Sequence, residues 1–380
     1  MEYRRFGKLD WKASALGFGC MRFPTLDGNR LSPNIEEAEA IRMLRHAIDN
    51  GVNYVDTAYP YHGGQSEIVV GRGLQGGYRE KVKLATKLPV WLVNDPADFD
   101  KLLNEQLGKL QTDHIDFYLL HALNQGRWRD IVLKHDLLAR AAAALADGRI
   151  RHLGFSIHDD YACFEEIVNG SELWSFCQIQ YNYMDTENQA GTRGLKLAAS
   201  KGLAVVVMEP LLGGRLVDPP QDIRAAMERF PVRRSPADWA LQWLWDQPEV
   251  SVVLSGMSTM AQVVENLQSA AASRMQSFSQ AEQELIAQAR KMYAARTVIP
   301  CTKCSYCMPC PTGVNIPGNF DFFNYAHLFD DVAGARFKYQ VFLTEEQRSG
   351  SCVECGTCED LCPQKIPIRE WMPKVSALLA

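Results

Sequence analysis

The sequence predicts an α/β protein in which a (β/α)8 TIM barrel is followed by a small, mainly helical, cysteine-rich module. Two observations lead to this prediction. Short apolar runs alternate with longer segments of helical periodicity up to about residue 295, and eight of the eleven cysteines lie beyond that point. We therefore expect two domains, a barrel over residues 1–295 and a module over residues 296–380.

Eight apolar runs are the expected barrel strands. They are rich in Val, Ile and Leu without regular polar alternation, which is typical of strands buried on both faces of a parallel sheet. Between them lie helical patterns such as residues 36–50, which end before Gly51, a favoured residue after a helix. Eight strand–helix units in this length match a (β/α)8 barrel. The runs occupy residues 14–20, 52–58, 82–88, 114–121, 150–158, 176–183, 203–211 and 250–257.

A doubly wound open sheet is the alternative architecture. It predicts a Gly-x-Gly-x-x-Gly turn after the first strand. Here Gly17-Phe18-Gly19 is followed by Cys20, and the position of the third glycine holds an arginine. The missing turn favours the barrel.

The composition argues against several classes of partner. The chain has 40 Lys and Arg against 45 Asp and Glu, a net charge of −5, which leaves no basic excess for binding a nucleic acid. No stretch approaches the roughly 18 apolar residues that span a membrane. The first twenty residues carry scattered charges and lack the apolar core of a signal peptide. We therefore expect a cytoplasmic protein without a nucleic-acid or membrane partner.

Two cysteine-rich runs predict two [4Fe-4S] clusters in a ferredoxin-like iron–sulfur module. Such a cluster needs four thiolates, and Cys-x2-Cys steps let one loop supply three of them. Zinc is the alternative, although zinc ribbons place their cysteine pairs well apart. Disulfides are less favoured because they are rare in a reducing compartment. The expected ligands are Cys301, Cys304, Cys307 and Cys310 in the first run and Cys352, Cys355, Cys358 and Cys362 in the second.

The spacing of the second run predicts how these ligands are shared. Cys362 follows after three residues and precedes a proline, as in bacterial two-cluster ferredoxins, where this fourth cysteine binds the other cluster. By this pattern Cys362 completes the cluster of the first run, and Cys310 completes that of the second. The first run is one residue shorter before Cys310, so ligation within each run is the alternative.

Polar residues close three successive apolar runs in the first half of the barrel. They are Asp56, Lys87 and His121, and Tyr61 follows Asp56 in the next loop. Because the carboxyl ends of barrel strands form the active-site face, we expect these side chains to converge. Each one also has an ordinary interpretation as a helix cap or a packing residue. Their occurrence together favours an active site.

These residues and the cysteine runs carry a resemblance to a known family. The barrel resembles the aldo/keto reductases, and the tail, with its CxYCMPCP and CxxCGxCExxCP motifs, resembles the branch of that family with ferredoxin-type 4Fe-4S motifs. The resemblance implies reduction of a small carbonyl substrate by NAD(P)H. The matching segments are Asp56-Thr57-Ala58 with Tyr61, Thr86-Lys87, Leu120-His121, Gly154-Phe155-Ser156, Gln178-Ile179-Gln180 and Glu265-Asn266.

The resemblance also implies a catalytic tetrad. Hydride arriving at a carbonyl carbon leaves charge on the oxygen, which Tyr61 would neutralise by donating a proton. Lys87, held charged by Asp56, would bring the pKa of Tyr61 nearer to the working pH. His121 would orient the substrate oxygen and assist proton transfer.

Cofactor contacts are implied in the same way. Ser156 and Gln178 would hold the nicotinamide carboxamide, and Met208 takes the place of a stacking tyrosine. Ile157 replaces a usual asparagine, and residues 256–262 hold no Lys or Arg for a 2′-phosphate, so the choice between NADH and NADPH is open. The implied contacts to the phosphate and adenosine end of the cofactor are Ser258, Gln262, Glu265 and Asn266. For Glu265 and Asn266, an ordinary helix surface is the alternative.

Three classes of function follow from these features. The first is a carbonyl reductase whose clusters transfer electrons to a redox partner protein. The second is an electron-transfer protein in which the barrel is a docking scaffold, and the third is a reductase with purely structural clusters. Nicotinamide transfers two electrons together, and we find no flavin-binding signature that would convert them into single electrons. We therefore expect the clusters and the hydride step to act separately.

Overall fold

The computed structural model describes residues 1–380 except 30–31, 302, 304–305 and 363. The chain divides into two compact units. The barrel unit comprises Met1–Val217 and Arg234–Phe278, and the helical unit comprises Asp218–Arg233 and Ser279–Ala380. The expected domain boundary at residue 295 stays a prediction.

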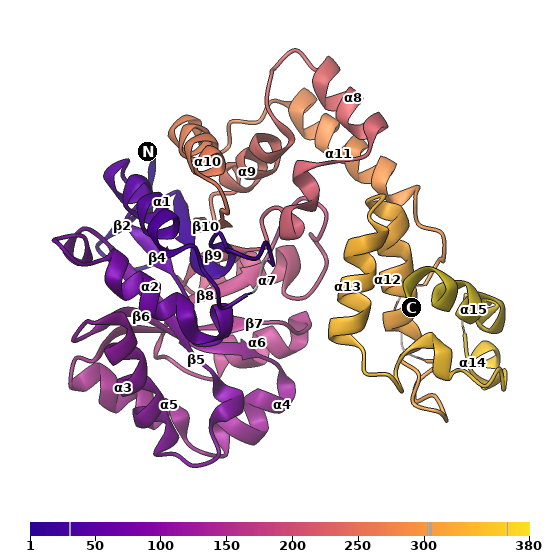
Figure 1. The fold of residues 1–380 in the computed structure, drawn as a ribbon, viewed down its shortest axis with the longest axis horizontal. Coiled ribbons are helices and arrows are strands. Elements are labelled where there is room, and N and C mark those ends of the chain that lie inside the picture. The colour runs from indigo at the N-terminus through magenta and orange to yellow at the C-terminus, as the bar shows by residue number, and fades with distance from the viewer. Residues whose placement is uncertain (30–31, 302, 304–305, 363) are drawn as a thin grey trace. The chain divides into compact units, whose positions relative to one another are not determined.

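The barrel unit contains a closed barrel of eight parallel strands, as the sequence predicts (Figure 1). Neighbouring strands follow one another in the chain, and the last pairs with the first. In order of the chain, the strands are β3 (Leu16–Gly19), β4 (Tyr54–Asp56), β5 (Lys83–Leu88), β6 (Ile115–Leu123), β7 (Ile150–Ile157), β8 (Trp174–Gln180), β9 (Ala204–Met208) and β10 (Val250–Gly256).

Helices surround the barrel and follow most of its strands. They cover the strands with a continuous apolar core, so the strands are buried on both faces, as their Val- and Ile-rich sequences require. The helices of this unit are α1 (Glu37–Asp49), α2 (Gln65–Gly73), α3 (Asp98–Leu110), α4 (Gln125–Arg127), α5 (Leu137–Ala146), α6 (Tyr161–Asn169), α7 (Gly191–Ser200), α9 (Pro236–Asp246) and α10 (Met260–Ala272).

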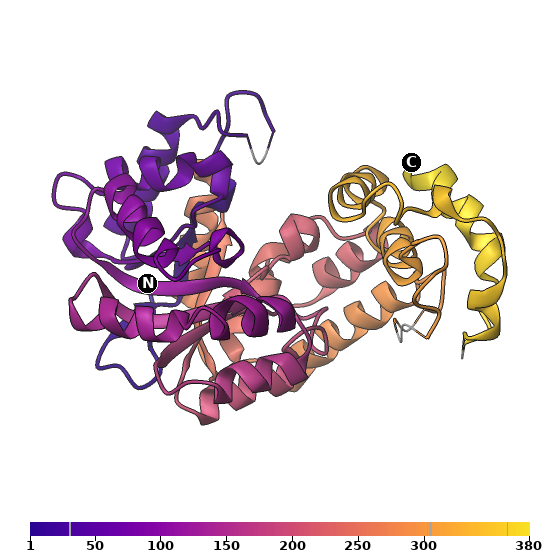
Figure 2. The same ribbon diagram turned by 90° about the horizontal axis from the view of Figure 1, so that it is seen from below.

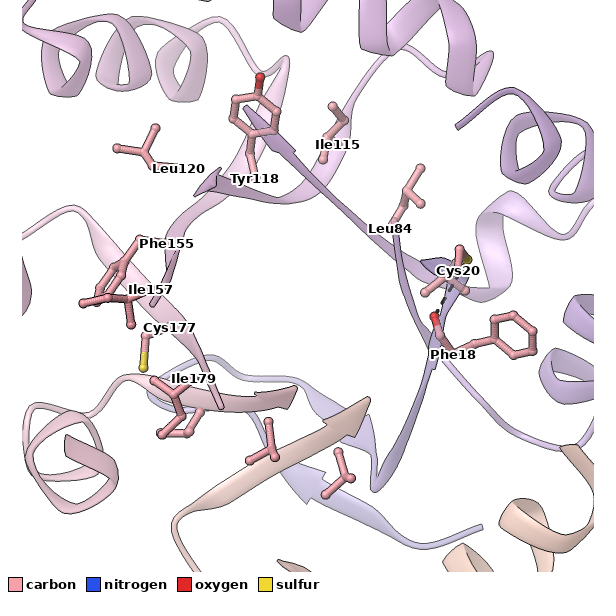
Figure 3. Close-up of a cluster of buried hydrophobic side chains, with 14 of the residues drawn as sticks. Phe18, Cys20, Leu84, Ile115, Tyr118, Leu120, Phe155, Ile157, Cys177 and Ile179 are labelled. Atoms are coloured by element: carbon pink, nitrogen blue, oxygen red, sulfur yellow. Dashed lines mark hydrogen bonds between the residues drawn. The ribbon is translucent and has the colours of Figure 1, made fainter. Parts of the chain in front are cut away.

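In six of the eight strands, β4, β5, β6, β8, β9 and β10, neighbouring residues belong to two different apolar clusters. The outer cluster joins the strands to the helices, and Figure 3 shows several of its members, including Leu84, Phe155 and Cys177. The inner cluster fills the barrel and includes Ala85 and Phe176. This two-residue period fixes which side chains enter the barrel. Ile157 belongs to the outer cluster, so its side chain is part of the core.

A two-stranded hairpin, β1 (Tyr3–Arg5) and β2 (Lys12–Ser14), lies at the amino-terminal end of the barrel. The turn between its strands inserts Phe6 into the inner cluster, where the ring centroid lies 4.6 Å from that of Phe117. Since this end is filled by packed side chains, a site inside the barrel is confined to the carboxyl ends of the strands.

The helical unit is built around its own apolar core, in which α12 (Ile316–Leu328) packs against α13 (Val332–Phe342) and α15 (Ile368–Leu379). Figure 2 shows its helices from a second direction. None of the helices in the described part of the chain is long and apolar enough to cross a lipid bilayer. The helices of this unit are α8 (Gln221–Arg229), α11 (Gln280–Ala294), α12 (Ile316–Leu328), α13 (Val332–Phe342), α14 (Thr357–Asp360) and α15 (Ile368–Leu379).

Candidate functional site

Strand alternation places the predicted catalytic residues inside the barrel. Tyr54 and Ala85 belong to the inner cluster, so Asp56 and Lys87, each two residues further along the same strand, face the same interior. The loop after β4 returns Tyr61 to this end of the barrel, where its hydroxyl lies 3.3 Å from the Lys87 ammonium. The same inner face holds residues predicted to contact nicotinamide at the ends of β7, β8 and β9, namely Ser156, Gln178 and Met208.

Lys87 is the centre of the arrangement. Its side chain is 1% exposed, and its ammonium donates to Asp56 Oδ1 at 2.7 Å, to the carbonyl of Thr57 at 2.8 Å and to the hydroxyl of Tyr61 at 3.3 Å. These three bonds use all three donors of the ammonium. The orientation of Lys87 is therefore fixed before any ligand binds.

The pKa values of these residues follow from burial and from this ion pair. Burial alone would lower the pKa of Lys87, but the Asp56 carboxylate and Tyr61 outweigh it, so the pKa is raised and the ammonium stays charged. For Tyr61, burial raises the pKa above its ordinary value of 10.0, and the charge of Lys87 opposes this. The expectation that Lys87 lowers the pKa is right for its own contribution. The net direction is the opposite, because removal from water has the larger effect.

His121 lies beside Tyr61 as a neutral imidazole. The ring centroids of the two residues are 6.2 Å apart with nearly perpendicular planes, and the centroid of the Trp91 ring lies 5.2 Å from that of His121. Burial and the charge of Lys87 hold the pKa of His121 well below its usual 6.5. Its buried Nδ1 has no hydrogen-bond partner within the described residues, so this atom is available to a ligand.

The predicted nicotinamide end contains a second buried polar atom without a partner. Gln178 is 2% exposed, and its Oε1 accepts no hydrogen bond from the part of the chain that the structure describes. An unpaired buried carbonyl is costly, and the amide N–H groups of a carboxamide would satisfy it. Ser156 is less available, because its Oγ accepts a bond from the backbone N–H of Ala122 at 2.7 Å. Met208 is half-buried at the end of β9. These residues fit a bound nicotinamide.

The residues predicted at the adenosine end lie after β10 and on α10, where each contacts another part of the protein. Gln262 Oε1 accepts from the backbone N–H of Ser258 at 2.8 Å, and the exposed Glu265 accepts from the hydroxyl of Ser235 at 2.6 Å. Asn266 is buried and donates to Ser255 Oγ at 2.9 Å. Their contacts to a cofactor stay a prediction.

Sequence reasoning missed a cation beside this turn. Arg22 follows β3, and its backbone carbonyl accepts a bond from Ser258 Oγ at 2.8 Å. Its side chain crosses Gly256 so closely that a Cβ there would lie 2.7 Å from Arg22 Cγ. Arg22 is distant in sequence from residues 256–262, and the pairing of β3 with β10 brings the two segments together. No local pattern in residues 256–262 could therefore indicate this cation.

In the helical unit, a single cavity is lined by cysteines from both runs. Cys310 of the first run lies there with Cys352, Cys355 and Cys358 of the second. Cys362 is absent from this cavity wall and is buried in the apolar core of the unit. Four thiols around one cavity fit a [4Fe-4S] cluster, in which each thiolate binds its own iron. Within the described residues, no three Cys, His, Asp or Glu side chains come close enough to share a single ion.

Of the three remaining cysteines of the first run, the structure describes Cys301 and Cys307. Cys301 and Cys307 are partly buried against the same apolar core as Cys362. Cys304, predicted as a ligand, lies outside the described residues.

A cation also lines the cysteine cavity. Arg369, at the start of α15, forms an ion pair with Glu359 at 2.7 Å. Gly356 has a φ of 83°, and a Cβ there would lie 3.4 Å from the Arg369 guanidinium. A glycine at this position thus allows both the left-handed turn between two ligands and the approach of the cation.

Comparisons with known proteins match both parts of the chain. The model of the aldo/keto reductase family matches residues 15–287, and that of a 4Fe-4S dicluster domain matches residues 300–366. The uncharacterized oxidoreductase YqkF of Bacillus subtilis is 29% identical in an alignment of 308 residues that covers 72% of this chain and 93% of that protein. The aldo-keto reductase YhdN of the same organism is 33% identical in an alignment of 165 residues that covers 41% of this chain and 47% of that protein. The holo form of aldo-keto reductase AKR11C1 from Bacillus halodurans matches with a TM-score of 0.63 and 26% identity, covering 76% of this chain and 96% of its own.

Proposed function

The chain belongs to the aldo/keto reductase family and is an oxidoreductase with a 4Fe-4S dicluster domain, and from this premise we propose that it reduces a small carbonyl compound with NAD(P)H at the barrel mouth. The observation that carries the proposal is the position of Lys87, which bonds both Asp56 and Tyr61. A phenol held against a fixed ammonium is suited to giving a proton to a carbonyl oxygen as that oxygen gains charge.

Each member of the tetrad has one role. When bound, the nicotinamide supplies the hydride. Tyr61 donates its proton to the substrate oxygen, and the Lys87 ammonium stabilises the phenolate that remains. Asp56 keeps Lys87 charged inside the barrel. His121 is neutral, so its imidazole can donate a hydrogen bond that orients the carbonyl without adding a buried charge.

We propose that the helical unit holds two [4Fe-4S] clusters and that the fourth ligand of each cluster comes from the other cysteine run. Cys310 completes the cluster of Cys352, Cys355 and Cys358, because all four line one cavity. Cys362 then completes the cluster of the first run, and its burial beside the core that Cys301 and Cys307 contact supports this assignment. The first-run cluster is thus held by Cys301, Cys304, Cys307 and Cys362.

The clusters pass single electrons to an external redox partner, and the hydride step does not require them. Hydride transfer moves two electrons together, whereas such a cluster moves one. The exposure of Cys355 supports electron exchange with a partner protein at this edge of the unit. Two roles compete with this one: the barrel only docks a partner, or the clusters only stabilise the fold. The absorbance of the clusters during turnover distinguishes these roles.

The experiment is oxidation of NADH and NADPH by anaerobically purified protein against a panel of small aldehydes and ketones. The proposal expects turnover with at least one carbonyl compound and its loss in Tyr61→Phe. Protein that binds nicotinamide but reduces none of the panel, while its clusters exchange electrons with a donor protein, would favour the docking scaffold instead.

A further inference from the structure

Two further side chains, Trp91 and Arg127, extend the arrangement beyond His121. Trp91, in the loop after β5, lies with its ring centroid 5.2 Å from that of His121. The guanidinium carbon of Arg127, at the end of α4 after β6, lies 4.8 Å from the centre of the same Trp91 ring. His121 and Arg127 are therefore both in contact with one indole.

Arg127 is held in place by the backbone beside His121. Its Nη1 donates to the carbonyl of Ala122 at 2.6 Å, and its own backbone N–H donates to the side chain of Asn124 at 2.8 Å. Its Nε and Nη2 have no hydrogen-bond partner within the described residues, so part of the guanidinium fork is available. The residue is half-buried.

The charge of Arg127 has no counterion in the part of the chain that the structure describes. Burial lowers the pKa of Arg127 with no opposing contribution from a carboxylate. Two residues away, the exposed Arg129 is paired with Glu166 at 2.7 Å. Removing a cation from water without pairing it is unfavourable. Within the described residues, Arg127 is therefore left as a half-buried cation without an anionic partner.

We infer that Arg127, stacked on Trp91, binds a carboxylate on the substrate, so that the preferred substrates are small carbonyl compounds that also carry a carboxylate. This inference rests on the proposed function and specifies its substrate class. Arginine binds carboxylates through two parallel N–H donors, which sets orientation as well as affinity. With the carboxylate at Arg127, a flat substrate lies along Trp91 and presents its carbonyl to His121 and Tyr61.

The test compares two aldehydes of the same shape. 4-Carboxybenzaldehyde carries the anion, and 4-carbamoylbenzaldehyde replaces it with a neutral amide. For Arg127→Gln we expect kcat/KM for the carboxylated aldehyde to fall about tenfold to hundredfold, the usual effect of losing a hydrogen bond to a charged group. The value for the amide should stay within about twofold. Arg127→Lys should retain part of the preference, and the surface control Arg129→Gln should retain all of it.

The two outcomes that overturn the inference differ from failure of the proposed function. Equal losses on both aldehydes would make Arg127 a structural support for the end of β6, and a wild type without preference for the carboxylate would remove the site. Binding of 4-(hydroxymethyl)benzoate, measured by calorimetry, is a readout without turnover. If the wild type reduces neither aldehyde but loses this binding in Arg127→Gln, the anion site stands and the proposed function fails.

Discussion

The ammonium of Lys87 lies 3.3 Å from the hydroxyl of Tyr61 at the carboxyl end of the barrel. A cation at this distance stabilises the phenolate far more than the neutral phenol, so it acts when the proton leaves. Burial raises the pKa of Tyr61 in the absence of a ligand. The phenol therefore keeps its proton until charge develops on the substrate oxygen.

Tyr61→Phe tests this role while preserving the shape of the side chain. We expect kcat for carbonyl reduction to fall by a factor of about 100 to 10,000, the usual contribution of a positioned general acid. Cofactor binding, followed by nicotinamide fluorescence, should change little. Tyr59→Phe is the matched control, because the Tyr59 hydroxyl donates to the exposed Glu105. Near wild-type turnover in Tyr61→Phe would refute the assignment.

Lys87→Met should affect stability as well as activity. Removal of the ammonium leaves the buried Asp56 carboxylate without its 2.7 Å partner, and breaking a buried pair in this way costs about 3–5 kcal/mol. The double variant Asp56→Asn/Lys87→Met removes both charges and should recover part of this loss. Denaturant unfolding of the two variants measures the difference. Equal unfolding free energies for both would show that the pair is not buried in solution.

The pH profile of carbonyl reduction tests the state of His121. Burial and the charge of Lys87 lower the pKa of His121 well below 6.5. A lowered pKa favours the neutral form, so the imidazole has already lost its proton at and above the ordinary histidine range. We expect kcat/KM to show no histidine inflection between about pH 6.5 and 8. An inflection near 6.5 that disappears in His121→Asn would contradict this.

Positions along the strands could be predicted from the sequence, but the balance of forces at the site could not. Asp56, Lys87 and His121 each close an apolar run, which is enough to place them at the carboxyl end of a barrel. The direction of the Tyr61 pKa depends on how far its hydroxyl is removed from water, and no local pattern encodes this. The sequence shows Arg127 only as an arginine in a polar loop, because its contact with the Trp91 ring is formed by the fold.

For the cysteines and for the helices of the helical unit, the sequence likewise predicted some features and not others. The spacing of Cys362 before its proline predicts exchanged ligands. Cys310 lines a cavity with three cysteines of the second run, and the exchange of ligands stays a prediction. The grouping of α8 and α11 with the helical unit had no signal in the sequence. A helical period shows that one face is buried but not which core buries it.

Iron analysis tests the cluster assignment. Protein prepared without oxygen should contain about eight irons per chain, four for each cluster, whereas about two zinc ions would refute it. Under exchanged ligation, Cys310→Ser should leave the same electron paramagnetic resonance spectrum as Cys355→Ser, and Cys362→Ser the same as Cys307→Ser. Cys163→Ser is the control, because Cys163 is buried in the barrel unit. Ligation within each run predicts the opposite pairing of spectra.

The most direct test of the account is anaerobic mixing of intact protein with NAD(P)H and its best aldehyde, with nicotinamide and cluster absorbance followed together. We predict that one nicotinamide is oxidised for each aldehyde reduced, that cluster absorbance does not change, and that Tyr61→Phe slows the reaction at least about 100-fold. Rapid bleaching of the clusters by NAD(P)H alone, or aldehyde reduction at a near wild-type rate in Tyr61→Phe, would contradict a hydride step carried out by the barrel alone.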